Sequence, residues 1–160
     1  MKKSVMWIFI VLFAITLQST IIPYLSISGI YPDLVLATIM VIALWHGRLA
    51  AIWGGFFTGL LLDSWAPTTL GMQSMALITA GVFVGLFDNK RINSGPFAQF
   101  FLFILGTAVH NLIVYFAVGG FGGSLVSFFF GRVIPSALFT SIFGMVIIFL
   151  GHQVHPYGRR

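Results

Sequence analysis

Five polar residues stand within otherwise apolar segments, and their side chains are the ones that could do chemistry. Asp33 and Asp63 are carboxylates, His110 and Asn111 are neighbours, and Arg132 is a lone cation. Counted from the expected helix ends, all five fall at a similar depth near the outer side of a membrane. A charge buried in a bilayer is costly without a partner. We therefore expect a polar cluster, with Arg132 paired to Asp63 or Asp33, that forms an outward cavity or receives a partner's segment.

The alternative interpretation places these residues at the level of the lipid headgroups, with Arg132 reaching outward along its aliphatic stem. Gln18, Gln73 and Ser74 fall at the same level. For these three residues the headgroup interpretation is the favoured one. For Arg132 and Asp63, opposite charges at one depth favour a pair that specifies the fold or serves function.

Known catalytic arrangements fit these residues poorly. Asp63 does not follow the Gly-x-Gly motif expected of an intramembrane aspartyl hydrolase, and His110 has only Ser124, in a Gly-rich turn, as a hydroxyl to activate. His152 and His155 lack carboxylate support for a metal site. The chain has no cysteine, which excludes thiolate ligands and disulfides. We expect no catalytic residue, no metal and no cofactor.

Small residues recur every four positions in one apolar segment and so share one face of a helix. Small side chains at that spacing allow another helix to approach closely. The stripe is therefore an interface, either between helices of this chain or with another protein. Its members are Gly47, Ala51, Gly55 and Gly59, ending at Asp63, with a weaker repeat at Gly81 and Gly85.

The elements that must position these residues are membrane helices. Of the 160 residues, 59% are hydrophobic and only 7% are charged, whereas about a quarter of a soluble domain is charged. The eight basic residues are dispersed, so nucleic-acid binding is not expected. Since a spanning helix needs about 20 apolar residues, we predict an all-α polytopic membrane protein, with 1–160 as one transmembrane domain. The six predicted helices lie near 5–24, 32–46, 49–64, 72–87, 96–118 and 127–150.

Two of these helices are short. The segments 32–46 and 49–64 are joined by a tight turn at His46-Gly47-Arg48. Each is short for a hydrocarbon core of about 30 Å. They are two short spanning helices or a re-entrant hairpin. A hairpin would remove two crossings, so both versions leave the two termini on the same side of the membrane.

The distribution of basic residues orients the helices. With six spans, seven of the eight basic residues fall on one side, and the positive-inside rule makes that side cytoplasmic. Both termini are then expected in the cytoplasm. Arg132, within the last predicted helix, is the one basic residue outside this set. The seven residues are Lys2, Lys3, Arg48, Lys90, Arg91, Arg159 and Arg160.

Short motifs follow one another along residues 31–88. They are Tyr31-Pro32-Asp33-Leu34, Trp45, Trp53-Gly54-Gly55-Phe56-Phe57-Thr58-Gly59-Leu60-Leu61-Leu62-Asp63, Thr69-Leu70-Gly71 and Ala76-Leu77, with weaker support from Pro135 and Ala137-Leu138. This series resembles the MreD family of the bacterial rod-shape machinery, the elongasome. Six spans in about 160 residues strengthen the resemblance.

The resemblance implies a non-enzymatic scaffold that binds MreC and, through it, the RodA glycosyltransferase and its class B penicillin-binding partner in peptidoglycan synthesis. It also implies the actin-like MreB on the cytoplasmic side. The family's fold is similar to that of the substrate-binding subunits of energy-coupling-factor transporters. A vitamin-binding subunit is therefore the alternative function, although residues 7–14 lack the Ala-x-x-x-Ala face of such subunits. A small channel or proton-coupled carrier using Asp63, His110 and Arg132 is a third hypothesis.

The predicted topology can be tested by cysteine labelling. Cysteines placed singly at Gly120 and Thr68 are expected to react with an impermeant thiol reagent added to intact cells, because both positions fall in outer loops. A cysteine at Ser94 is expected to react only after the cells are opened. Labelling at Ser94 alone would reverse the orientation.

Overall fold

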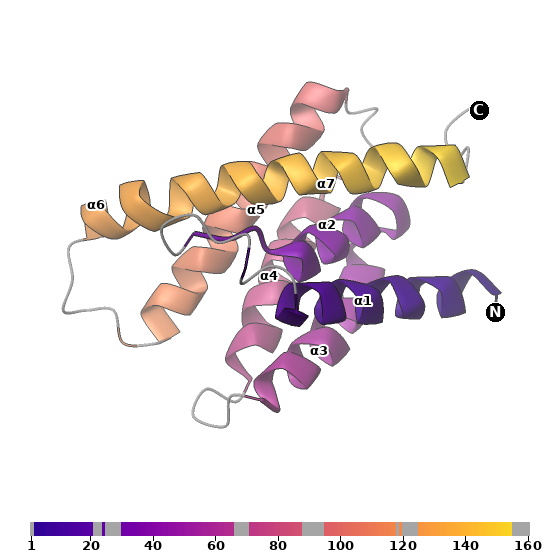
Figure 1. Cartoon of the computed structure of the whole chain (residues 1–160), viewed down its shortest axis with the longest axis horizontal. Helices are drawn as coiled ribbons and strands as arrows, with labels where there is room; N and C mark the ends of the chain where they lie inside the picture. The colour runs from indigo at the N-terminus through magenta and orange to yellow at the C-terminus, as the bar shows by residue number, and fades with distance from the viewer. Residues whose placement is uncertain are drawn as a thin grey trace.

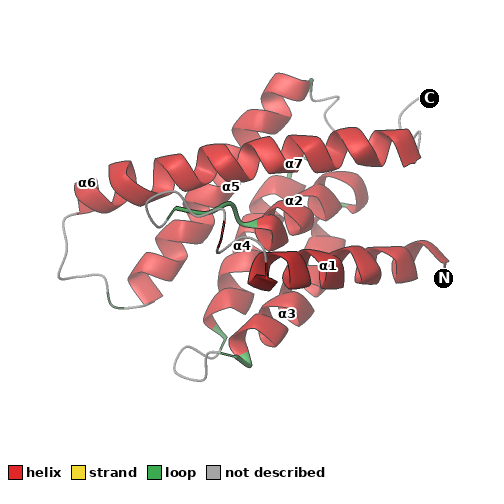
Figure 2. Ribbon diagram, in the orientation of Figure 1, coloured by secondary structure: helices red, strands yellow, loops and turns green. Residues whose placement is uncertain are grey.

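The protein is described by a computed structural model that covers residues 2–20, 24, 30–65, 71–87, 95–117, 119 and 125–154. In this part of the chain six helical rods form one bundle (Figures 1 and 2). They are α1 (Lys2–Thr20), α2 (Leu34–His46), α3 (Arg48–Asp63), α4 (Met72–Gly85), α5 (Pro96–Ala117) and a continuous rod made of α6 (Leu125–Phe128), a π-helical segment η4 (Phe129–Val133) and α7 (Ile134–Val154).

The helix bounds differ from the sequence prediction mainly in the first and last rods. The first begins at Lys2 and ends at Thr20, against a predicted 5–24, and the last extends from Leu125 to Val154, against a predicted 127–150. Several predicted features lie outside the described residues: Lys90, Arg91, Arg159 and Arg160 of the cytoplasmic set, Asp88, Thr69-Leu70 of the motif series, Ser124 and His155.

Helix α2 is the centre of the bundle. Every residue from Leu34 to Leu44 is buried, and α2 contacts α1, α3, α4, α5 and α7. A helix that is apolar on all sides is stable only when it is surrounded. Its 13 residues make a rod of about 20 Å, which is well short of a bilayer core. Because protein encloses α2, this shortness exposes none of its backbone to lipid.

The two ends of the bundle can be followed through side-chain contacts. At one end the ring of Trp7 in α1 lies 5.5 Å from Trp45 and 5.3 Å from His46 at the end of α2. Gly151 of α7 abuts Trp45 at the same level. Figure 1 shows α1 beginning and α7 ending on this side of the bundle. Gly47, with φ 82°, makes the tight turn into α3.

The last rod widens into a π-helical turn just before Pro135. The N–H of Ile134 donates to the carbonyl of Phe129, five residues earlier. Proline supplies no N–H, and its ring clashes with the carbonyl four residues before it in a regular α-helix. The wider turn accommodates that clash. Arg132 lies within this turn and is exposed.

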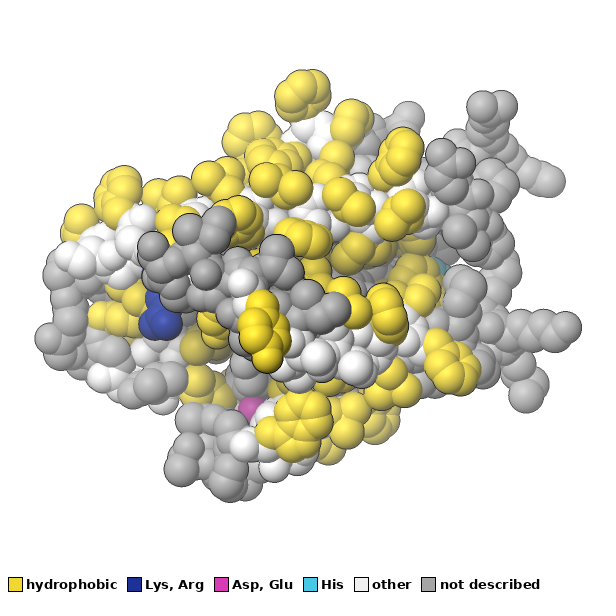
Figure 3. Space-filling model, in the orientation of Figure 1, with side chains coloured by type: hydrophobic (Ala, Val, Ile, Leu, Met, Phe, Trp, Pro, Cys, Tyr) yellow, Lys and Arg dark blue, Asp and Glu magenta, His cyan; other side chains and the backbone are white. Residues whose placement is uncertain are grey.

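The outer surface of the bundle is largely apolar, as the face in Figure 3 shows. Exposed aromatic side chains include Phe97 at 82% and Phe130 at 68%. Two of the described helices, Pro96–Ala117 and Val126–Gly151, are long and apolar enough to cross a membrane, while Phe9–Thr20, Leu34–His46 and Met72–Gly85 are shorter apolar helices. Exposed apolar area on this scale marks a surface that meets lipid or another protein.

The small-residue stripe lies in the contact between α3 and α4. A Cβ atom added at Gly59 would collide with the Cα of Ser74, and one at Gly55 would lie 3.1 Å from the nitrogen of Ile78. From the α4 side, a Cβ at Gly81 would meet the Cβ of Ala51 at 3.0 Å, and one at Gly85 would meet the Cα of Arg48 at 2.8 Å. The two helices therefore pack backbone to backbone along their length. This arrangement supports the interpretation in which the stripe is a contact between helices of this chain.

Gly59→Ala is expected to destabilise the protein. The added methyl group collides with the backbone of Ser74, and separating the helices costs about 1–3 kcal/mol or more. Membrane accumulation and thermal unfolding in detergent measure the loss. Gly131→Ala is the matched control, since a Cβ there meets nothing within 4 Å. Equal behaviour of the two variants would contradict the close α3–α4 contact.

Candidate functional site

The first residues of α2 are held by two acceptor side chains. Asp33 precedes the helix, and its Oδ1 accepts from the N–H of Leu36 at 2.8 Å. The Oε1 of Gln18, at the end of α1, accepts from the N–H of Val35 at 2.9 Å. The N–H of Asp33 donates to the Oγ1 of Thr140 in α7 at 3.0 Å. Asp33 and Gln18 thus satisfy donors that a helix N-terminus leaves unpaired.

Asp63 does the same for α4. Its carboxylate accepts from the N–H groups of Gly71 and Gln73, each at 3.0 Å, and from the N–H of Ser74 at 3.2 Å. The hydroxyl of Ser74 donates to it at 3.0 Å. Asp63 is fully buried. The positive end of the helix dipole adds to these hydrogen bonds, so the N-terminus of α4 stabilises the buried carboxylate.

The predicted pairing of Arg132 with Asp63 or Asp33 is wrong. In the described part of the chain Arg132 makes no ion pair with either carboxylate. The physical reason is that each acidic side chain is already occupied by the start of a helix, whose free N–H groups are closer donors. Arg132 is exposed in η4, so its charge is not buried and does not require a carboxylate partner.

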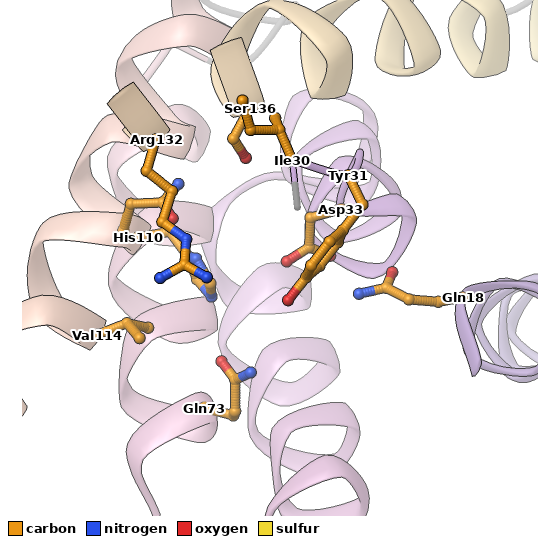
Figure 4. A pocket seen from close by; sticks show the side chains of 10 residues that line it. Gln18, Ile30, Tyr31, Asp33, Gln73, His110, Val114, Arg132 and Ser136 are labelled. Atoms are coloured by element: carbon orange, nitrogen blue, oxygen red, sulfur yellow. The ribbon is translucent and has the colours of Figure 1, made fainter. Parts of the chain in front are cut away.

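A polar cavity of about 140 Å³ brings together four of the five predicted cluster residues. Asp33, His110, Asn111 and Arg132 all line it, while Asp63 is not among the described residues that do. Figure 4 shows the side chains of Arg132 and Asp33 on opposite sides of this space. The remaining lining residues are Gln18, Ile30, Tyr31, Gln73, Val114 and Ser136.

Some polar atoms at this cavity have no protein partner. Among the described residues, His110 Nε2 and Gln73 Oε1 are buried and make no hydrogen bond, and His110 is only 5% exposed. The amide nitrogen of Asn111 is occupied, because it donates to the carbonyl of Thr107 at 2.9 Å. A buried polar atom without a partner costs free energy, so water or a ligand is expected at the unpartnered atoms. The volume holds several waters or one small polar group.

A second hollow is an apolar groove of about 410 Å³ along α1 and α3, with α2 between them. Trp53, Phe57 and Leu61, four residues apart on α3, are exposed along it. Its other lining residues are Trp7, Val11, Leu12, Ile42, His46, Ala50, Gly54 and Thr58. Because most of its lining residues are apolar, this groove suits an apolar occupant.

The sequence contained a signal for only some of these roles. Asp33 directly before an apolar segment is a recognisable helix N-cap. Gln18 and Gln73, which we expected at the headgroup level, also have places in the fold: Gln18 accepts a hydrogen bond at the start of α2, and Gln73 lines the cavity. Asp63 contacts residues 8 to 11 positions later, which no local pattern indicates.

A helical bundle with an apolar outer face is compatible with the class of helical membrane proteins. The comparison with protein families agrees. The chain belongs to the MreD family, because the family model for rod shape-determining protein MreD matches residues 1–152. It is therefore a rod shape-determining membrane protein. The comparisons with curated proteins and with solved structures give no match.

The cap on α4 leads to a double-mutant prediction. Asp63→Asn removes the charge and places an amide donor against backbone N–H groups, so the expected loss is about 1–3 kcal/mol of stability. Arg132→Gln is expected to change stability little, because the side chain is exposed. Thermal unfolding of the single and double variants in detergent is the measurement. Additive losses are expected, and restoration of stability in the double variant would show that the two charges interact after all.

Proposed function

We propose that this protein is a non-enzymatic scaffold of the bacterial elongasome, which binds MreC and through it supports RodA and the class B penicillin-binding protein in peptidoglycan synthesis. The observation that carries this proposal is the family match over residues 1–152. The polar residues add support, since Asp33, Gln18 and Asp63 are engaged in holding helix ends. Side chains used in this way stabilise a fold and are not arranged for bond cleavage.

The proposal includes a position for the partner. MreC is expected to present a single spanning helix, and the groove along α1 and α3 offers an apolar surface for one. Ala50 and Gly54 line the groove, and small residues allow close helix approach in lipid. The exposed side chains of Trp53, Phe57 and Leu61 would supply the dispersion contacts that drive association there.

The proposed topology is multi-pass in the bacterial cytoplasmic membrane, with six crossings and both termini in the cytoplasm. The apolar surface and the placement of the start of α1 and the end of α7 at one end of the bundle support it. The end that carries Arg48 would then face the cytoplasm and MreB, while the polar cavity would lie near the outer surface.

The alternative function, a vitamin-binding subunit related in fold to energy-coupling-factor transporters, is less well supported. The polar cavity of about 140 Å³ is smaller than the pockets of about 300–1,000 Å³ that enclose drug-sized ligands. The carrier hypothesis is weaker as well, because Asp63 is engaged at the start of α4 and does not face the cavity with His110 and Arg132.

A larger side chain in the apolar groove tests whether MreC docks there. Gly54→Leu places a branched side chain among the groove-lining residues, where an added Cβ approaches only the Cδ1 of Ile39, at 3.3 Å. The variant is expected to accumulate, with a small shift of the Ile39 side chain, but to recover at least about tenfold less co-expressed MreC in affinity purification from membranes, a loss of about 1.4 kcal/mol. Cells that depend on it are expected to become round.

Gly131→Leu is the matched control, because it adds the same side chain on another rod where an added Cβ meets nothing within 4 Å. Normal MreC recovery with both variants would remove the groove as the docking site. Failure of the unsubstituted protein to recover MreC would contradict the scaffold proposal itself.

A further inference from the structure

The polar cavity carries opposite charges on opposing walls. Arg132 from η4 and Asp33 from the start of α2 face the same space (Figure 4) without forming an ion pair within the described residues. Only one oxygen of Asp33 is engaged in a hydrogen bond there, by the N–H of Leu36. The cavity therefore presents a cationic donor on one side and a carboxylate acceptor on the other.

The remaining polar atoms at the cavity include both acceptors and donors. Gln73 Oε1 is a buried acceptor that lacks a donor, and His110 Nε2 is a buried ring nitrogen that lacks a partner. The oxygen of Gln18 is taken by Val35, which leaves its amide nitrogen as a donor. A simple anion would leave Gln73 unpaired and be repelled by Asp33. A simple cation would be repelled by Arg132.

We propose that this cavity binds a small zwitterionic group, whose oxyanion pairs with Arg132 and whose ammonium pairs with Asp33 and Gln73. Charge-assisted hydrogen bonds at both ends are the strong ones available to such a ligand. A cavity of about 140 Å³ admits a group of a few heavy atoms and excludes a larger molecule. Binding here does not depend on MreC, so its failure leaves the scaffold proposal standing.

Two sources share this chemistry. The headgroup of phosphatidylethanolamine carries a phosphate and an ammonium, and a free amino acid or phosphoethanolamine carries the same pair of charges. Arg132 is exposed, so the oxyanion end of the cavity can be reached from the protein surface by either source.

The experiment measures thermal unfolding of the purified full-length chain in detergent. Titrations use phosphoethanolamine, inorganic phosphate, ethanolamine, glycine, and short-chain phosphatidylethanolamine and phosphatidylglycerol. The zwitterionic probes are expected to raise the unfolding temperature in a saturable manner, and the single-charge probes are expected to bind at least about tenfold more weakly. Tighter binding of phosphatidylethanolamine than of phosphoethanolamine identifies a lipid headgroup as the source, and equal or weaker binding identifies a free zwitterion.

Two variants attribute the effect to the cavity. Arg132→Gln and Asp33→Asn are each expected to weaken zwitterion binding about tenfold or more, and asparagine preserves the helix cap that Asp33 provides. Arg48→Gln, at the opposite end of the bundle, is the matched control and is expected to bind normally. The proposal is overturned if no probe shifts unfolding, if phosphate or ethanolamine alone binds as tightly as the zwitterions, or if all three variants bind alike.

Discussion

The backbone N–H groups at the starts of α2 and α4 impose the constraint on which this structure depends. Both helices are short, at 13 and 14 residues, and both first turns contain buried residues, Leu34 to Leu36 in α2 and Ser74 in α4. An unpaired backbone donor in such surroundings is costly. Asp33 and Gln18 accept from α2, and Asp63 accepts from α4. Three of the polar residues within the apolar segments are therefore explained by the needs of helix ends.

The close contact of α3 with α4 and the cap on α4 form one structural unit. Asp63 ends the same helix face on which Ala51, Gly55 and Gly59 lie, and the absence of a side chain at Gly59 brings α3 against the backbone of Ser74. That approach is what places the Asp63 carboxylate within 3.2 Å of the Ser74 N–H. A larger residue at position 59 would remove the packing contact and lengthen these hydrogen bonds together.

Two surfaces remain once the helix caps are accounted for, and they differ in chemistry. The polar cavity joins η4, α5, α4 and the start of α2, while the apolar groove follows α1 and α3. A zwitterion in the first and a partner's helix in the second would not compete for the same residues. Arg132 lies in the π-helical turn that accommodates Pro135, and it lines the polar cavity from that turn.

The sequence by itself determined that the protein is helical and apolar, approximately where its helices begin and end, and which family it belongs to. These properties depend on composition, on apolar run length and on short-range motifs, all of which are local. It also placed Asp33, His110, Asn111 and Arg132 at one depth, and the structure brings these four to one cavity. The partner of each charge was decided only by the tertiary structure. Opposite charges at equal depth suggested that Arg132 pairs with Asp63, but depth does not specify position around the bundle. Because α3 packs on α4, the Asp63 carboxylate accepts hydrogen bonds from the N-terminus of α4 instead.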